Sequence, residues 1–388
     1  MDIHPTPVMP QGFQCASVNC GLKETGTDLS LFISDVACNA AAVFTRNRFP
    51  GAPVVVGREI IKHGKLRAIV VNSKVSNVGT GESGIANARK MGLAVADEFS
   101  MDPNQVLMSS TGVIAKPLPI EKIEQGIKGI GAFLSADPLV GAQGIMTTDT
   151  YPKALSLSVG QATLTMVAKG SGMIEPDMAT MLVYIFTDAS IASSSLDAML
   201  RKAVDTSFNM LSVDTDTSTS DTCVIMASGH KGPVDETAFS RALDFACVEM
   251  TKKLARDGEG ATKLLTSEVV NAFSRAEART IAKSLINSPL IKTMAYGADP
   301  NIGRILMALG KCFDCHVEPA RVEVSINGTL VYKDQSRVDF DEDNVRKLLT
   351  GDTVHIAVNL NAGTDHALAY GCDLTNGYIE ENAAYYSS

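Results

Sequence analysis

The feature that most constrains the fold is an uninterrupted apolar run, MLVYIF, at Met181–Phe186. A strand with one face in water alternates apolar and polar residues, whereas a continuous apolar run is typical of a strand buried on both faces. The sheet that contains this run therefore needs a covering layer on each side. Shorter runs rich in apolar or β-branched residues predict further strands at Ala68–Val71, Val106–Ser109 and Val224–Ala227.

Helical segments alternate with these strands. Ile85–Phe99 carries apolar residues at helical spacing, and Val234–Arg256 shows the same periodicity after an aspartate near its start. Arg321–Val331 alternates apolar and polar positions around Asn327-Gly328, a pair that tolerates the positive φ angles of a tight hairpin turn. The predicted class is α/β or α+β with mixed sheets.

Composition excludes several classes of protein. With 388 residues, 20% of them charged and 45% hydrophobic, the chain is globular and long enough for two or three domain-sized units. The net charge of −9 argues against a nucleic-acid binder, because phosphate attracts basic surfaces. No apolar run reaches the roughly 18 residues of a membrane helix.

The N-terminus, MDIHPTPVMPQGF, lacks the basic start and the apolar core of a secretory signal. We therefore expect a cytoplasmic protein with no membrane and no nucleic-acid partner. In that compartment the eight cysteines are expected to stay reduced and to pack as small hydrophobic residues.

The segment Lys169–Leu182, KGSGMIEPDMATML, admits two interpretations. In the simpler one, Thr180 is only a β-branched residue at the start of a strand. In the other, the Ala179–Thr180 peptide bond breaks, and Thr180 gains a free α-amine beside its hydroxyl. The hydroxyl is then a nucleophile, and an α-amine, with a pKa of about 8, is near enough to act as its base. Spacing alone does not decide between them.

The same segment closely resembles the cleavage motif of the ornithine acetyltransferases, the family of bifunctional glutamate N-acetyltransferases. Further blocks resemble that family in the family's own order, so the resemblance covers essentially the whole chain. These blocks are AAAVFTRNRFPGAPV (40–54), SSTGVI (109–114), IMTTDTYPK (145–153), SFN with DTDTSTSDT (207–222), DGEGATK (257–263), NSPLIKT with DPNIGR (287–304) and YGCDLTNGY (370–378). Each block alone is a weak signal, whereas the combination is highly specific.

The resemblance implies a fold and a set of chains. The implied fold is a four-layered αββα sandwich like that of the N-terminal-nucleophile hydrolases, with a smaller C-terminal α/β lobe at about 280–370. Self-cleavage implies an α chain of residues 1–179 and a β chain of residues 180–388. Two copies of each fragment are expected to form a heterotetramer.

The resemblance also implies a reaction, which belongs to arginine biosynthesis. Acetyl moves from N2-acetyl-L-ornithine to L-glutamate by a ping-pong mechanism through an acetyl ester on Thr180. The products are ornithine and N-acetylglutamate. This exchange requires no cofactor and no metal, and acetyl-CoA stays open as an alternative acetyl donor.

Carried onto this sequence, the resemblance assigns roles to individual residues. Thr180 is the nucleophile, Ala179 and Thr180 flank the cleaved bond, and Thr111 and Gly112 form the oxyanion hole. The substrate-binding residues are Thr147, Lys169, Thr180, Glu259, Asn382 and Ser387. The residue types suit the chemistry, because an N–H and a hydroxyl stabilise a negative oxygen and a lysine pairs with a carboxylate. Glu259 either receives an amine or moves a proton.

Four positions depart from the pattern common in arginine-pathway members of the family. Glu175 and Asp177 stand where those proteins commonly have alanine and asparagine. Thr215 stands at a common glycine, and Ser220 stands at a common asparagine. These departures resemble a side branch that includes the acetyltransferase of the clavulanic-acid pathway. Because the nucleophile and oxyanion pattern are retained, the expected differences concern the acceptor range and the pathway.

Three alternatives follow from the residues alone. An uncut chain on the same scaffold would only bind an amino acid. Asp214 and Asp216 resemble the aspartate pair of phosphatases that form an aspartyl-phosphate. Cys312, Cys315 and His316 match the C-x-x-C-H string of covalent haem attachment, for which the simpler interpretation is a pair of cysteines at the end of a helix.

Overall fold

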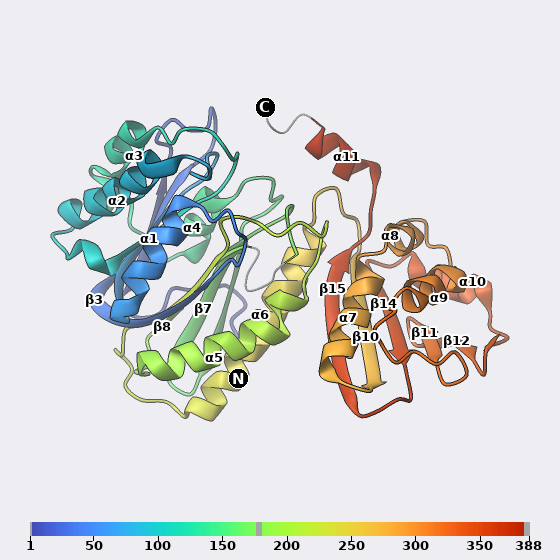
Figure 1. Cartoon of the computed structure of the whole chain (residues 1–388). Helices are drawn as coiled ribbons and strands as arrows, with labels where there is room; N and C mark the ends of the chain where they lie inside the picture. The colour runs from blue at the N-terminus through green and yellow to red at the C-terminus, as the bar shows by residue number, and fades with distance from the viewer. Residues whose placement is uncertain (1, 176–180, 384–388) are drawn as a thin grey trace. The chain divides into compact units, whose positions relative to one another are not determined.

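A computed structural model describes residues 2–175 and 181–383 of the chain. Tertiary contacts divide the chain into two compact units (Figure 1). Unit 1 takes its described residues from Met1–Gly170, Pro176–Asn209 and Thr217–Met250, and unit 2 takes its described residues from Ser171–Glu175, Met210–Asp216 and Thr251–Ser388. The chain therefore changes unit between Gly170 and Ser171, inside the segment that the sequence marks as a cleavage motif.

Unit 1 is built on a nine-stranded sheet in the order β1-β6-β7-β8-β9-β3-β4-β5, with β2 paired to β3. Its described strands are β1 (Asp2–Ile3), β2 (Phe13–Val18), β3 (Leu29–Phe44), β4 (Lys65–Asn72), β5 (Val106–Ser110), β6 (Lys153–Val159), β7 (Ala162–Lys169), β8 (Leu182–Thr187) and β9 (Thr222–Ala227). Every residue of β8 is buried, as the apolar run predicts.

The long strand β3 folds this sheet into two stacked layers. Its first half pairs with β2 and β4, its second half pairs with β9, and the register shifts between Ile33 and Cys38. The Phe32 ring, on the first half, lies 5.3 Å from the rings of both Tyr184 and Phe186 on β8. Because β9 separates β3 from β8 within the sheet, this contact requires the first half of the sheet to lie over the second.

Helices cover the outer faces of the two layers. They are α1 (Ala52–Ile60), α2 (Gly81–Glu98), α3 (Ile120–Ile127), α4 (Pro138–Ile145), α5 (Ser193–Thr206) and α6 (Glu236–Arg256). The helix α1 packs on α2 and β5, and α2 packs on α3. On the other side, α5 packs on β3, and Lys202 of α5 donates to Asp244 of α6 at 2.9 Å (Figure 1). The predicted αββα sandwich is confirmed in unit 1.

Unit 2 contains a six-stranded sheet in the order β13-β12-β11-β14-β10-β15. Its strands are β10 (Leu264–Ala272), β11 (Glu323–Ile326), β12 (Thr329–Lys333), β13 (Ser336–Arg337), β14 (Thr353–Asn359) and β15 (Asp365–Cys372). Its helices are α7 (Arg275–Ile286), α8 (Pro289–Tyr296), α9 (Ile302–Gly310), α10 (Glu342–Leu349) and α11 (Asn376–Asn382). The strand β10 runs parallel to β14 and antiparallel to β15, and α7 packs on β10 and β15. This is an α/β lobe of the expected type.

The predicted local elements are present with shifted ends. The runs 68–71, 106–109 and 224–227 lie within β4, β5 and β9. The predicted helix 85–99 corresponds to α2, which begins earlier at Gly81 and ends one residue earlier at Glu98. At the predicted hairpin, β11 and β12 pair antiparallel, and Asn327 and Gly328 adopt φ angles of 45° and 83°. These left-handed angles are the ones that the asparagine-glycine pair was expected to supply.

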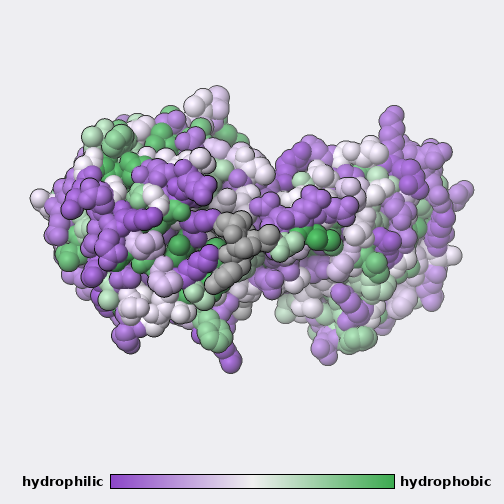
Figure 2. Space-filling view, turned by 90° about the horizontal axis from the view of Figure 1, so that it is seen from above, coloured by the Kyte–Doolittle hydropathy of each residue, from purple (hydrophilic) through white to green (hydrophobic). Residues whose placement is uncertain are grey.

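The polarity of the surface and the state of the cysteines are those expected of a globular chain. Figure 2 shows a largely hydrophilic face on which apolar residues form small separate groups. In the described ranges, no helix has both the length and the apolarity that crossing a bilayer requires. No cysteine of the described residues forms a disulfide, and burial raises the pKa of Cys15 to about 11, which keeps this thiol protonated.

Candidate active site

Unit 1 brings three of the predicted site residues together around the end of β7. Lys169 is the last residue of β7, and its side chain is buried, with the residue 8% exposed. Its Nζ donates to Thr147 Oγ1 at 2.8 Å and to Thr111 Oγ1 at 3.3 Å. Thr147 follows α4, and Thr111 follows β5. The loops after α4 and β5 therefore both meet the Lys169 ammonium group at the end of β7.

Asp149 organises this cluster, and the sequence interpretation did not single it out. Its Oδ1 accepts from Lys153 Nζ and from the Gly170 N–H, both at 2.7 Å, and its Oδ2 accepts from the Thr147 N–H at 3.1 Å. Burial raises the pKa of Asp149, but the charges of Lys169 and Lys153 outweigh burial and hold that pKa below its usual value. The only sequence signal was its place beside Thr147 in the block IMTTDTYPK.

Gly112 adopts a backbone conformation that other residues rarely reach. Its φ is +125°, and a Cβ there would lie 2.2 Å from the carbonyl carbon of Lys74. In the described part of the chain, the Gly112 N–H donates to no backbone carbonyl. The Thr111 N–H, in contrast, donates to Asn72 O at 3.0 Å. Thr111 therefore has its hydroxyl, and Gly112 its N–H, at the same turn after β5.

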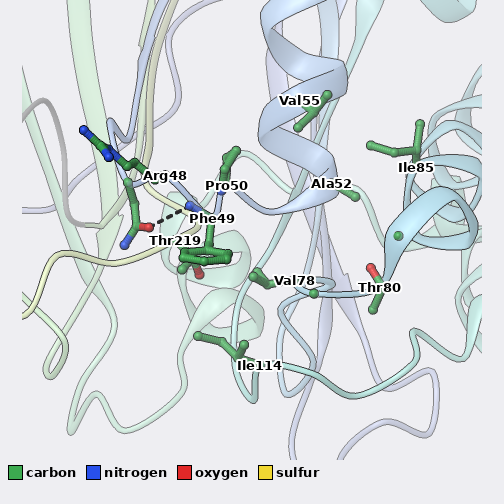
Figure 3. Close-up of a pocket in the computed structure, with 13 residues that line it drawn as sticks. Arg48, Phe49, Pro50, Ala52, Val55, Val78, Thr80, Ile85, Ile114 and Thr219 are labelled. Atoms are coloured by element: carbon green, nitrogen blue, oxygen red, sulfur yellow. Dashed lines mark hydrogen bonds between the residues drawn. The ribbon is translucent and has the colours of Figure 1, made fainter.

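A pocket of about 610 Å³ opens in unit 1 beside the segment that follows this turn. Figure 3 shows Phe49, Val78 and Ile114 along its wall, with the backbone of Phe49 held by a hydrogen bond to Asn47 Oδ1 at 2.9 Å. Ile114 lies two residues after Gly112, so the pocket is next to the turn that follows β5. Its lining is mainly apolar, which suits hydrocarbon better than the charged ends of an amino acid.

Unit 2 brings together two further predicted residues, Glu259 and Asn382. Asn382 ends α11, and its Nδ2 donates to Glu259 Oε2 at 2.7 Å. The Glu259 N–H donates to Ser171 O at 3.0 Å, and a Cβ on Gly172 would lie 2.2 Å from Glu259 Oε2. Glycine at 172 is therefore what allows the Glu259 carboxylate to lie against this backbone.

The remaining predicted residues, Ala179, Thr180 and Ser387, lie outside the described residues. The strand that follows Thr180, β8, pairs with two neighbouring strands of unit 1. Leu182 of β8 pairs with Lys169 of β7 and with Thr222 of β9, and the Thr222 N–H donates to Met181 O at 3.0 Å.

Asp221 is a second acid that sequence reasoning missed, and it directly precedes β9. It is only 1% exposed, and its Oδ2 has no hydrogen-bond partner among the residues that the structure describes. Burial raises the pKa of this carboxyl well above its usual value, although hydrogen bonds to Ser218 and Thr45 and the charge of Lys169 act against that rise. The burial of Asp221 therefore favours the neutral form of its carboxyl.

The alternative sites have structural uses. Asp214 accepts the N–H groups of Met173 and Ile174, at 2.6 and 2.8 Å. His316 of the C-x-x-C-H string donates its N–H to Glu277 at 2.7 Å, and its ring lies 4.1 Å from that of Phe273. Within the described ranges, no group of three or more His, Cys, Asp or Glu side chains is arranged to hold a metal ion.

Comparisons with known proteins agree across the chain. A model of the ArgJ family matches residues 14–387. The arginine biosynthesis bifunctional protein ArgJ 2 of Clostridium acetobutylicum is 44% identical over 380 residues, which are 97% of this chain and 98% of that protein. The glutamate N-acetyltransferase Oat2 of Streptomyces clavuligerus is 41% identical, with 98% of both chains covered.

A crystal structure of the arginine biosynthesis bifunctional protein ArgJ from Bacillus halodurans is 40% identical, with a TM-score of 0.51, and covers 53% of this chain and all of its own. The family predicted from the sequence blocks, and the acetyltransferase class that goes with it, are confirmed. The chain belongs to the ArgJ family.

Proposed function

We propose that the chain cuts itself between Ala179 and Thr180 and then transfers acetyl from N2-acetyl-L-ornithine to L-glutamate through an acetyl ester on Thr180. The products are ornithine and N-acetylglutamate. The observation that carries the proposal is the buried Lys169 ammonium, shared between the Thr111 and Thr147 hydroxyls beside Gly112. The name of the Streptomyces relative, a glutamate N-acetyltransferase, supports glutamate as the acetyl acceptor, and the name of the Clostridium relative supports a role in arginine biosynthesis.

Self-cleavage needs no outside reagent except water. The Thr180 hydroxyl attacks the Ala179 carbonyl carbon, the C–N bond breaks, and the hydroxyl proton passes to the departing amide nitrogen. The resulting ester is hydrolysed by water, which leaves a carboxylate on Ala179 and a free amine and hydroxyl on Thr180.

The Bacillus halodurans structure supports a separate second fragment. That solved chain aligns over its whole length and covers 53% of this chain. Residues 180–388 are 209 of the 388 residues, which is close to the same share. A fragment of this size is what cleavage before Thr180 predicts.

Acetyl transfer then uses the same hydroxyl twice. Thr180 Oγ attacks the acetyl carbon of N-acetylornithine, its α-amine carries the proton to the leaving nitrogen, and ornithine departs. Glutamate then attacks the ester with its own amine and takes the acetyl group. Each half-reaction passes through a tetrahedral intermediate with a negative oxygen, for which the Gly112 N–H and the Thr111 hydroxyl are the proposed donors.

The contacts of Lys169 support this oxyanion hole. Because Thr111 Oγ1 accepts from the Lys169 ammonium, its own hydrogen is directed to another acceptor. The positive charge also favours a negative oxygen nearby in a buried site. Lys169 and Thr147 are the proposed partners of the substrate carboxylate. Asp149 accepts from the backbone N–H of Thr147 and from that of Gly170, the residue after Lys169.

Glu259, Asn382 and Ser387 complete the proposed substrate set. The Asn382 amide donates to Glu259 and so fixes the direction of that carboxylate. A fixed carboxylate suits the charged amine of ornithine or glutamate, which is the role we propose for Glu259.

The proposal also covers the assembly of the fragments, the location of the protein and the range of acetyl donors. Two copies of each fragment are proposed to form a heterotetramer, which sedimentation of the purified protein tests. The proposed location is the cytoplasm. Acetyl-CoA is an alternative donor, and ester formation on Thr180 with acetyl-CoA and no acetylornithine would establish it.

Intact-protein mass spectrometry under denaturing conditions tests the proposal first. We expect two fragments that meet at Ala179/Thr180, and one added acetyl group on the second fragment after incubation with N-acetylornithine. Thr180→Ala should give one uncut chain without acetyl transfer. A wild-type chain that stays intact at 41.1 kDa would contradict self-cleavage and favour an amino-acid-binding protein.

A further inference from the structure

The segment Ser171–Glu175, which we call the upstream segment, lies just before the proposed cleavage point and is anchored throughout within unit 2. At its start, Ser171 Oγ donates to Asp257 O at 2.6 Å, and Ser171 O accepts from the Glu259 N–H at 3.0 Å. Ser171 is almost completely buried, so these two bonds are not exchanged for water.

Asp214 holds the middle of the upstream segment with both carboxylate oxygens. Its Oδ2 accepts from the Met173 N–H at 2.6 Å, and its Oδ1 accepts from the Ile174 N–H at 2.8 Å. Two consecutive N–H groups converge on one carboxylate because Met173 has a φ of 54°, in the left-handed region. A methionine held in this conformation is strained, and it persists only where its surroundings require it.

The end of the upstream segment is tied to the same loop and to α7. The Val213 N–H donates to Ile174 O at 2.7 Å, and the Glu175 N–H donates to Asp216 O at 3.0 Å. The Glu175 carboxylate lies 3.2 Å from Lys283 Nζ and accepts from Asn287 Nδ2 at 2.8 Å. The last described residue before the proposed cleavage point is thus fixed through both its backbone and its side chain.

The other side of the proposed cleavage point is also held, by the pairing of Leu182 with β7 and β9 in unit 1. The described backbone on each side of the proposed cleavage point is therefore held within its own unit. Attack of a hydroxyl on the preceding carbonyl needs the reacting atoms about 3–3.5 Å apart, and a displacement of about 1 Å can cost 100-fold in rate. Fixing the backbone just upstream of the cleaved bond therefore helps to meet this geometric requirement.

We propose that Asp214 is a positioning residue for self-cleavage, which it assists by fixing the backbone of Met173 and Ile174 upstream of the cleaved bond. This role rests on the self-cleavage of the proposed function. It differs from the phosphatase role considered from the sequence, because the carboxylate acts through backbone N–H groups and takes no part in bond making.

The test follows the cut fraction of rapidly purified full-length chains by intact-protein mass spectrometry over time. In Asp214→Ala, which loses both acceptors, we expect cleavage to slow by about 10- to 100-fold. Asp214→Asn should slow it less, because one amide oxygen still accepts an N–H. Acetyl transfer per cut chain should fall by a smaller factor than the cleavage rate, which a general structural defect would not produce.

Asp216→Asn is the matched control. It removes the same charge from the same exposed loop, and in the described residues Met173 and Ile174 do not donate to its side chain. It should be cut at the wild-type rate.

Thermal unfolding is measured for every variant, and Asp214→Asn carries the test if the alanine variant unfolds. Folded Asp214 variants that are cut as fast as wild type would overturn the positioning role and leave self-cleavage intact. An uncut wild-type chain would instead overturn the proposed function itself.

Discussion

The two segments that meet at Gly170 are held in different ways. Before it, Lys169 ends a strand of unit 1, and its neighbours Asp149 and Lys153 form an ion pair with both side chains fully buried, at 2.7 Å. After it, Ser171–Glu175 is held in unit 2 mainly by backbone N–H groups, and the Glu175–Lys283 pair has side chains that are 20% and 22% exposed. The position of the first segment depends on a buried ion pair, whose partners water cannot replace. The position of the second segment depends on several individually weaker hydrogen bonds.

The largest expected effect is therefore on stability in the first segment. Asp149→Ala leaves Lys153 buried without its carboxylate, and we expect a loss of about 3–5 kcal/mol in the free energy of unfolding. Glu175→Ala, at a partly exposed pair, should lose only about 1–2 kcal/mol. Urea unfolding of the two variants side by side measures both values. Equal losses would remove the contrast between the segments.

The stabilisation by Asp149 should depend on pH. Since its folded-state pKa is lowered, the contribution is fully present above the unfolded-state value, near pH 4, and is lost as pH falls through the lower folded-state pKa. The gap in melting temperature between wild type and Asp149→Ala should therefore narrow in acid.

The next effect concerns turnover. Lys169→Met removes the ammonium shared by Thr111 and Thr147, and we expect acetyl transfer to fall about 100- to 1,000-fold, as for loss of an oxyanion donor. Steady-state kinetics with N-acetylornithine and glutamate measures the change on cut enzyme. Lys202→Met, an exposed position on α5, is the control and should retain wild-type turnover. A fully active Lys169→Met enzyme would mean that the ammonium charge plays no part in acetyl transfer and that the side chain has only a structural role.

Asp221 sharpens the comparison, because it is as buried as Asp149 but has no lysine at bonding distance among the described residues. Its raised folded-state pKa means that folding is penalised as pH rises above the unfolded-state value, near pH 4. Asp221→Asn should therefore be more stable than wild type at pH 7, by about 1.4 kcal/mol for each unit of the shift. Melting curves from pH 4 to pH 7 test this, and a gain that does not shrink toward pH 4 would contradict it.

The smallest expected effect lies in the loop that holds the second segment. Thr215 has a φ of 70°, which strains a β-branched residue by about 1–2 kcal/mol, whereas glycine costs about 0.5–1 kcal/mol in backbone entropy. Thr215→Gly should therefore stabilise the chain by roughly 0.5–1 kcal/mol. Thr215→Ala keeps the Cβ and should gain less, and thermal unfolding compares the two. A destabilised glycine variant would show that the threonine side chain has its own role.

Much of the fold was predictable because its signals are local. All of the run MLVYIF except Met181 lies in the fully buried strand β8, and Asn327-Gly328 forms the turn of a hairpin. Both signals are local, because periodicity and turn chemistry act over a few residues. The helix predicted at 85–99 begins four residues earlier, at Gly81, where a glycine-rich start hides the periodicity. The family blocks identified Lys169, Thr111 and Thr147, which the structure then brings into contact.

The sequence by itself predicted four of the strands, one hairpin and the family, since each of these signals depends on residue order. Only the tertiary structure decided in which direction the pKa of Asp149 and of Asp221 shifts, and which backbone groups Asp214 holds. Asp149 and Asp221 are the same residue type in the sequence. In the fold, the charges of Lys169 and Lys153 act on Asp149, whereas Asp221 Oδ2 has no hydrogen-bond partner among the described residues. Asp214 accepts from the N–H groups of Met173 and Ile174, about forty residues away in the sequence. Charge state and positioning depend on neighbours that the fold assembles, because electrostatic energy follows distance in space and local dielectric.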